Sequence, residues 1–275
     1  MNRVLTGGAL IALVFACALF APLLATHDPN EQDLLNILLP PSFAAGGDPA
    51  FLLGTDSLGR DEFARLLFGA RLALLVAVSA ACGAALLGAV LAHIAGYFGG
   101  WIDWLIGRAV EIWLSFPPVI LSLILMVGLG TGADKVVLAI VLVDWTRFCR
   151  VLRAEVLVTA RRDYVAAARL AGFTHTQTLL REILPATLPL LITLLSLEMG
   201  IAVIVEAVLS FVGLGVTADQ VAWGQMIADA RTSFAEAPWT LLIPMAAIFL
   251  TVTGCNLLGD GLRRTLDVRL VTGRA

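Results

Sequence analysis

RRDYVAAARLAGFTHTQTLLREILPA, residues Arg161 to Ala186, is polar and rich in alanine, although the sequence on either side of it is almost entirely apolar. Residues 163–171 contain no Gly or Pro, and three consecutive alanines give this stretch a high helix propensity. Gly172 stands where helices commonly end in the left-handed conformation. Thr174, followed three residues later by Gln177, forms a capping box for a second helix. The pattern therefore predicts two short helices joined by a tight turn.

The surface of this helical pair permits two interpretations. Small side chains at residues 166–168 would allow another protein to approach the helix closely. Tyr164 and Arg169 flank these alanines and belong to residue types that commonly anchor protein interfaces. An amphipathic connector lying on the inner face of a membrane would show the same pattern, so physical chemistry alone leaves both interpretations open.

The composition of the whole chain indicates a membrane protein. Of its 275 residues, 59% are hydrophobic and 14% are charged, whereas a soluble domain carries about 25% charged residues. The net charge of -3 and the lack of a basic stripe with interleaved aromatic residues argue against a nucleic-acid partner. Cys17, Cys82, Cys149 and Cys255 lie in or beside apolar runs without metal-ligand spacing, so we expect neither a metal site nor a bound cofactor in this chain.

Six apolar runs are candidates for membrane-crossing helices, each of which needs about 20 residues. They lie near Gly7–Ala25, Leu72–Ala95, Leu105–Gly130, Lys135–Phe148, Leu188–Gly215 and Trp239–Leu258. Pro117 and Pro118 predict a kink in the third run. We therefore expect an all-α polytopic membrane protein with six transmembrane helices. Residues 1–71 would hold the first helix and an external segment, and residues 72–275 the core transmembrane domain, with an inner loop at about 155–187.

The distribution of basic residues predicts the orientation of these helices, because cytoplasmic loops carry an excess of Lys and Arg. When the N-terminus is placed inside, most of the 18 Lys and Arg residues fall in the inner loop, the C-terminal tail and the other inner segments. An even number of spans returns the C-terminus to the same side. Both termini are thus predicted to be cytoplasmic, and residues 26–71 and 216–238 external.

Acidic residues within the apolar runs are candidate functional groups, because charges at membrane depth are costly. Glu198 and Glu206 are eight residues apart in the fifth run and would share one helix face. They would either line a pathway that recognises an amine or a cation, or pair with a polar group of a partner subunit. Asp144 and Arg147 are spaced for a local ion pair.

No catalytic or nucleotide-binding motif is evident in the sequence. A phosphate-binding loop needs Gly-Lys-Ser/Thr, but Lys135 is the only lysine and Asp134 precedes it. Nucleophiles, bases and metal ligands do not cluster either, so we do not expect an enzyme. A stand-alone ion- or proton-coupled carrier that uses Glu198 and Glu206 is one class of protein that fits these residues. The lack of a visible internal repeat weakens this interpretation.

The quoted segment resembles the EAA motif, the loop that couples ABC-importer permeases to their ATPases. That motif has Glu-Ala-Ala, a Gly four residues after the last Ala, and a later Ile and Leu-Pro, which correspond to Ala166–Ala168, Gly172 and Ile183–Pro185. Asp163–Val165 resembles the Glu-Tyr-Val start typical of the oligopeptide/dipeptide branch. Further blocks resemble that branch in the expected order: Leu53–Arg71, Glu111–Pro117, Glu206–Gly215, Trp223–Arg231 and Asn256–Arg269. The chain is thus similar to the second, C-type permease of a peptide or nickel importer.

The chain departs from the family pattern inside the loop. Ala166 stands where the wider superfamily has Glu, Glu182 where peptide permeases commonly carry His, and Ala186 where Asn is common. These differences bear on local contacts of the loop.

The resemblance implies a type I ABC-importer permease fold in the bacterial inner (cytoplasmic) membrane. It also implies a heterodimer with a second homologous permease, two ATP-binding subunits that hold ATP and Mg, an external solute-binding protein and contact with membrane lipid. The cargo would be a peptide or a related small solute. The residues expected to couple to the ATPases are Asp163, Tyr164, Val165, Ala167, Ala168, Arg169 and Gly172.

Overall fold

The computed structural model describes residues 2–217 and 219–266. Within them the chain is helical, and the only β-pairing is an isolated bridge between Thr55 and Asp61. The helices are α1 (Asn2–Leu19), α2 (Ala21–Leu24), α3 (Glu62–Phe98), α4 (Gly100–Leu114), α5 (Pro118–Leu129), α6 (Ala133–Thr159), α7 (Asp163–Leu170), α8 (His175–Thr178), the π-helix η1 (Leu179–Ile183), α9 (Leu184–Phe211), α10 (Trp223–Ala230) and α11 (Trp239–Leu266). The predicted all-α fold is confirmed.

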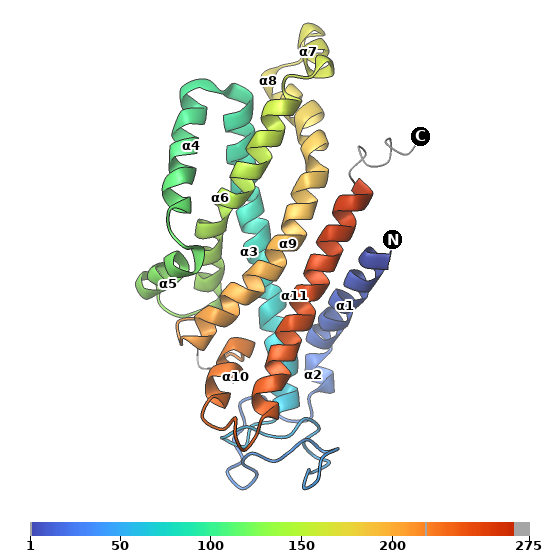
Figure 1. Cartoon of the computed structure of the whole chain (residues 1–275), viewed down its shortest axis with the longest axis vertical. Helices are drawn as coiled ribbons and strands as arrows, with labels where there is room; N and C mark the ends of the chain where they lie inside the picture. Colours follow the sequence, from blue (N-terminus) through green and yellow to red (C-terminus); the bar gives the residue numbers. More distant parts are fainter. Residues whose placement is uncertain (1, 218, 267–275) are drawn as a thin grey trace.

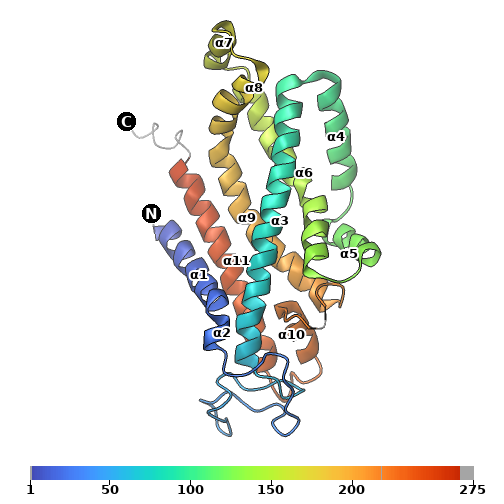
Figure 2. The same ribbon diagram turned by 180° about the vertical axis from the view of Figure 1, so that it is seen from behind.

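The long helices run roughly along one axis of the molecule, and its two ends differ. Helices α3, α6, α9 and α11 form the body, α7 and α8 lie at one end, and residues 26–61 form the opposite end (Figure 1). From behind, α1 lies beside α11, while α4 flanks the other side of the body (Figure 2). The inner loop and the external segment are therefore separated by the full length of the body.

Small residues allow α3 and α6 to pack closely in the body. Alanines of α3 are buried against Trp145, Phe148 and Cys149 of α6. A Cβ atom at Gly88 of α3 would lie 2.5 Å from the carbonyl oxygen of Trp145, so only glycine fits without a shift of the backbone. This contact makes α3 and α6 the central pair on which the other helices pack.

Three helical segments meet the length and hydropathy needed to cross a membrane: Glu62–Phe98, His175–Phe211 and Trp239–Thr265. The pair α4 and α5 would add a fourth if it forms one broken span, since the two helices meet at 89°. The break falls just before Pro118, so the predicted kink in the third run is confirmed. Helix α1 is shorter, and α6 carries several charged residues along its length. Six spans are thus not established by length and composition.

Residues 26–61 lead into α3 through a capped turn. The carboxylate of Asp61 accepts hydrogen bonds from the backbone N–H groups of Phe63 and Ala64. The apolar residues that follow belong to α3, which continues without interruption from Glu62 to Phe98. The residues around Arg71 are therefore part of one long helix.

Candidate functional site

The polar loop quoted at the outset forms the predicted helical pair at the end of the body opposite residues 26–61 (Figure 1). Gly172 follows α7 with a φ of 93°, in the left-handed region that favours glycine. At the start of α8 the Gln177 N–H donates to Thr174 Oγ1 at 3.2 Å, and the Thr174 N–H donates to Gln177 Oε1 at 2.9 Å. Both ends of the turn are therefore set by local interactions, and the capping box is confirmed.

One side of α7 is anchored to the body of the protein. Val165 is buried against Val156 of α6 and Ile183 of η1, and Tyr97 at the end of α3 packs against the same cluster. Three separate elements, α3, α6 and η1, thus meet beneath α7. A force applied to α7 would be transmitted directly to α3, α6 and the start of α9.

The opposite side of α7 is open to a partner. Tyr164 and Ala167 are exposed, as a docking surface requires. Leu170 is 90% exposed, and sequence reasoning did not select it. The sequence signal that could have identified Leu170 is an apolar residue in the last turn of a polar helix, two residues before a glycine in a turn. A bare leucine at this position is the type of side chain that a partner would bury.

An aromatic contact ties the loop to α3. The Tyr97 hydroxyl and His175 Nδ1 are hydrogen-bonded at 2.9 Å, and the guanidinium of Arg169 lies 6.0 Å from the centre of the Tyr97 ring. Phe98 also packs against both the Tyr97 and His175 rings. Arg169, expected to face the ATPase, therefore also contacts its own chain.

The second loop helix does not end where prolines enter the sequence. Pro185 occupies the first turn of α9 and Pro189 lies inside it, yet His175–Phe211 forms one helical segment of 37 residues. The π-turn η1 lies between the loop and α9, where such turns often mark functional positions. The loop and α9 are thus mechanically continuous.

The two acidic residues of α9 are buried and have partners within the chain. Glu198 is 2% exposed, and its Oε2 lies 3.5 Å from Nη1 of Arg147, which also lies 3.6 Å from Asp144. The predicted Asp144–Arg147 pair is confirmed, and Glu198 joins it. Glu206 is 1% exposed and accepts a hydrogen bond from Ser210 at 2.6 Å. A place for either glutamate in the substrate pathway stays a prediction.

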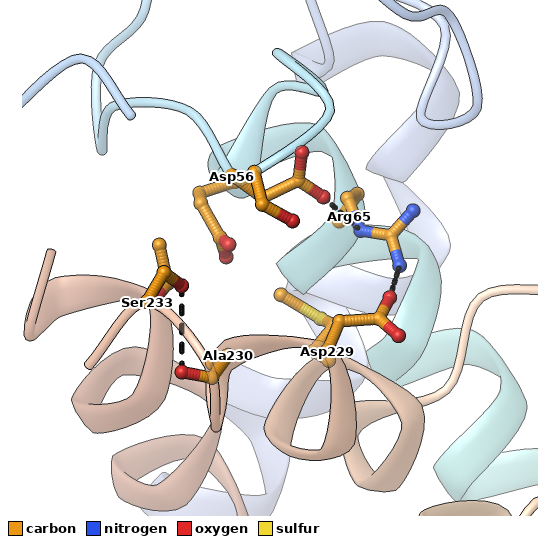
Figure 3. A pocket seen from close by; sticks show the side chains of 9 residues that line it. Asp56, Arg65, Asp229, Ala230 and Ser233 are labelled. Carbon is orange, nitrogen blue, oxygen red and sulfur yellow. Dashed lines mark hydrogen bonds and ion pairs between the residues drawn. The ribbon is translucent and has the colours of Figure 1, made fainter. Parts of the chain in front are cut away.

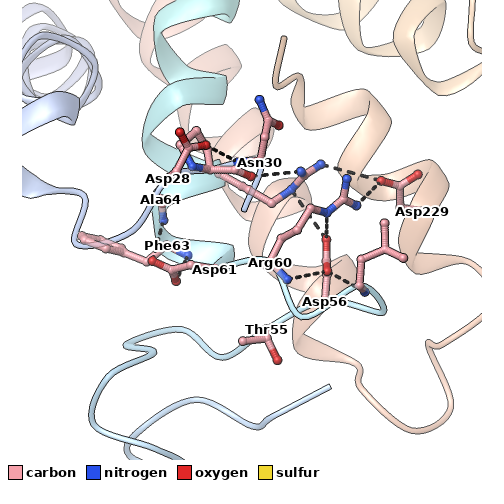
Figure 4. Close-up of polar contacts among 12 residues, drawn as sticks. Asp28, Asn30, Thr55, Asp56, Arg60, Asp61, Phe63, Ala64 and Asp229 are labelled. Carbon is pink, nitrogen blue, oxygen red and sulfur yellow. Dashed lines mark hydrogen bonds and ion pairs between the residues drawn. The ribbon is translucent and has the colours of Figure 1, made fainter. Parts of the chain in front are cut away.

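A charged network at the outer end joins three segments that are distant in sequence (Figures 3 and 4). Arg60 donates to Asp56 at 2.6 Å and to Asp229 of α10 at 2.7 Å, and buried Arg65 of α3 lies 3.7 Å from each carboxylate. Burial opposes the charge of Arg60, but the two carboxylates outweigh it and raise the pKa of Arg60 above its ordinary value. The only signal for this link in the sequence was weak, namely complementary charges in residues 26–71 and 216–238.

Comparison with known proteins identifies the family. Residues 84–272 match the family described as the binding-protein-dependent transport system inner membrane component, and residues 3–41 match the N-terminal TM domain of oligopeptide transport permease C. The di/tripeptide transport system permease protein DppC of Pseudomonas aeruginosa is 40% identical over 98% of this chain and 89% of its own length.

Two further relatives are named for the transport of other solutes. The oligopeptide transport system permease protein OppC of Bacillus subtilis is 34% identical over 97% of this chain and 85% of its own. The nickel transport system permease protein NikC of Escherichia coli K12 is 37% identical over 97% and 94%. The resemblance seen in the loop thus extends over nearly the whole sequence, and the chain belongs to the inner-membrane permease components of binding-protein-dependent ABC importers.

Proposed function

We propose that this permease subunit forms, together with a second homologous permease, the membrane pathway through which short peptides or a related small solute are imported. The observation that carries the proposal is the loop of α7 and α8, anchored on one side by Val165 and open on the other at Leu170. The cargo class is supported by the di/tripeptide and oligopeptide relatives. An external solute-binding protein would deliver the cargo to the end formed by residues 26–61.

Six spans and two cytoplasmic termini complete the proposed topology. The spans would be α1, α3, the broken pair α4–α5, α6, α9 and α11. Arg3 near the start of α1 lies 3.3 Å from Asp260 near the end of α11, so the two terminal helices have their free ends at the same level. This arrangement supports a location of both termini on the side of the basic loop, where the excess of arginine predicts the cytoplasm.

The proposed mechanism uses α7 as the point where the ATPases act. ATP and Mg would be held by two separate ATP-binding subunits, whose closure around ATP displaces α7. Because Val165 is packed against α6 and η1, the displacement moves the long helices as rigid bodies. The pathway then alternates between inward-open and outward-open states. No bond is made or broken by this chain, which is a transport subunit and not an enzyme.

The stand-alone carrier is not supported as an alternative. Family membership indicates a permease driven by a separate ATPase. Glu198 and Glu206, on which a proton-coupled carrier would depend, are both engaged within the chain.

The proposal is tested by ATP-dependent uptake in vesicles that contain the reconstituted importer. Ala167→Glu places bulk and charge on the open side of α7 and is expected to abolish uptake of a labelled dipeptide while the protein still inserts. Ala45→Glu, at an exposed alanine at the opposite end of the molecule, is the matched control and is expected to leave binding of the ATPase subunits unchanged. Normal uptake and normal ATPase binding in the Ala167 variant would disprove the docking role.

A further inference from the structure

A groove of about 380 Å³ lies between α4 and α6, away from the two buried glutamates of α9. Small-molecule sites in proteins typically measure 300–1,000 Å³, so the groove has room for a ligand of a few residues. Its α4 wall is largely apolar, with Ile106, Val110 and Leu114. Figures 1 and 2 both show α4 beside the body, on the side opposite α1 and α11. The groove is therefore a separate feature from the loop and the outer network.

Two arginines of α6 reach this groove, but only one of them is available. Arg153 forms a double contact with Asp103 of α4, including a hydrogen bond of 2.6 Å from Nη2 to Oδ2. Arg150 is exposed and forms no ion pair or hydrogen bond with any residue in the described part of the chain. All the N–H donors of the Arg150 guanidinium are therefore available to an anionic group of a ligand.

An acidic side chain lines the same groove. Glu111 of α4 contacts Arg108 at 2.6 Å, one helical turn earlier, and both side chains are exposed. Exposed ion pairs contribute little to stability, about 0–1 kcal/mol, so this contact can be exchanged for a ligand cation at low cost. The groove thus presents one available cationic group, Arg150, and one exchangeable anionic group, Glu111, beside the apolar residues of α4.

We propose that this groove binds the charged ends of a zwitterionic short peptide during its passage. Arg150 takes the terminal carboxylate through paired N–H donors, a geometry for which arginine is well suited. Glu111 takes the terminal ammonium, and the apolar residues of α4 contact the side chains of the cargo. The inference rests on the proposed import of peptides and extends it, because it assigns contact with cargo to α4 and α6 and not to Glu198 or Glu206.

The test measures dipeptide binding to the purified complete importer in lipid nanodiscs, without the solute-binding protein, by equilibrium dialysis of labelled dialanine. Arg150→Gln is expected to weaken binding of free dialanine about tenfold or more, the effect of losing a charge-assisted hydrogen bond. It is expected to leave unchanged the weaker binding of C-terminally amidated dialanine. Glu111→Gln should likewise weaken binding of free dialanine, but it should leave unchanged the weaker binding of N-acetylated dialanine, which lacks the terminal ammonium.

Two controls separate this site from a general loss of structure. Arg71→Gln removes an exposed arginine near the outer end of α3 and is expected to leave binding unchanged. Arg150→Lys retains the charge but loses the paired donors, so its affinity for free dialanine is expected to lie between those of wild type and Arg150→Gln.

The proposal is overturned if wild-type importer does not bind dialanine at millimolar concentration, or if free and amidated peptides lose equal affinity in Arg150→Gln. It is also overturned if that variant loses only co-purified anionic phospholipid, which would make the groove a lipid site. Uptake with the binding protein present is measured in parallel. Intact ATP-dependent dipeptide uptake alongside a failed binding test would refute the groove alone, whereas absence of peptide uptake in the wild type would refute the proposed function.

Discussion

Replacement of Leu170 by alanine is expected to weaken attachment of the ATPase subunit. Leu170 is 90% exposed, so docking of α7 into a partner would remove almost the whole side chain from water. Complete burial of a leucine side chain contributes roughly 1.5–3 kcal/mol. Loss of about 2 kcal/mol corresponds to a roughly 30-fold increase in Kd, at 1.4 kcal/mol for each factor of ten. Because the side chain is exposed in this subunit, its own stability should change by less than about 0.5 kcal/mol.

The assay titrates labelled ATPase subunits onto the permease heterodimer in nanodiscs and records fluorescence anisotropy. Leu35→Ala is the matched control, since Leu35 is 95% exposed but lies in the external segment at the opposite end. A Kd for Leu170→Ala within threefold of wild type, with an equally unaffected control, would refute the reasoning that Leu170 is buried by the ATPase.

Three further substitutions test the other contacts described above. Gly172 has a φ of 93°, and a Cβ there would meet no atom within 4 Å, so a substitution causes backbone strain without a clash. Gly172→Val should therefore impair uptake through strain of about 1–2 kcal/mol, and Gly172→Asn should impair it less. Tyr97→Phe removes the bond to His175, and faster amide exchange in α7 and α8 is expected; unchanged exchange would contradict the link. Asp229→Asn should lower the unfolding temperature in detergent more than Asp219→Asn does at an exposed site, and equal shifts would exclude a stabilising network.

The loop was predictable from sequence because its determinants are local. Gly172 and the pair Thr174 and Gln177 act within a few residues of one another, and the structure has each in its expected role. The break before Pro118 was predictable for the same reason, although its 89° angle was not. Short-range signals of this kind determine the local structure independently of how the rest of the chain packs.

Long-range partners were not predictable in the same way. Arg60 and Asp229 are 169 positions apart, and no periodicity connects them. Arg147 was expected to pair with Asp144, but only the packing of α9 on α6 brings Glu198 to the same guanidinium. Prolines commonly end or bend a helix, but the helical segment His175–Phe211 runs past both Pro185 and Pro189.

The uninterrupted helix from His175 to Phe211 has a mechanical consequence. At 1.5 Å per residue, its 37 residues make a rod of about 55 Å that runs from the loop of α7 and α8 to the neighbourhood of α10. If such a rod tilts by about 10° around its midpoint, its two ends move by about 5 Å in opposite directions. A displacement of the loop would then close one end of the pathway and open the other at the same time. The bundle would move as a lever that pivots near the middle of the membrane.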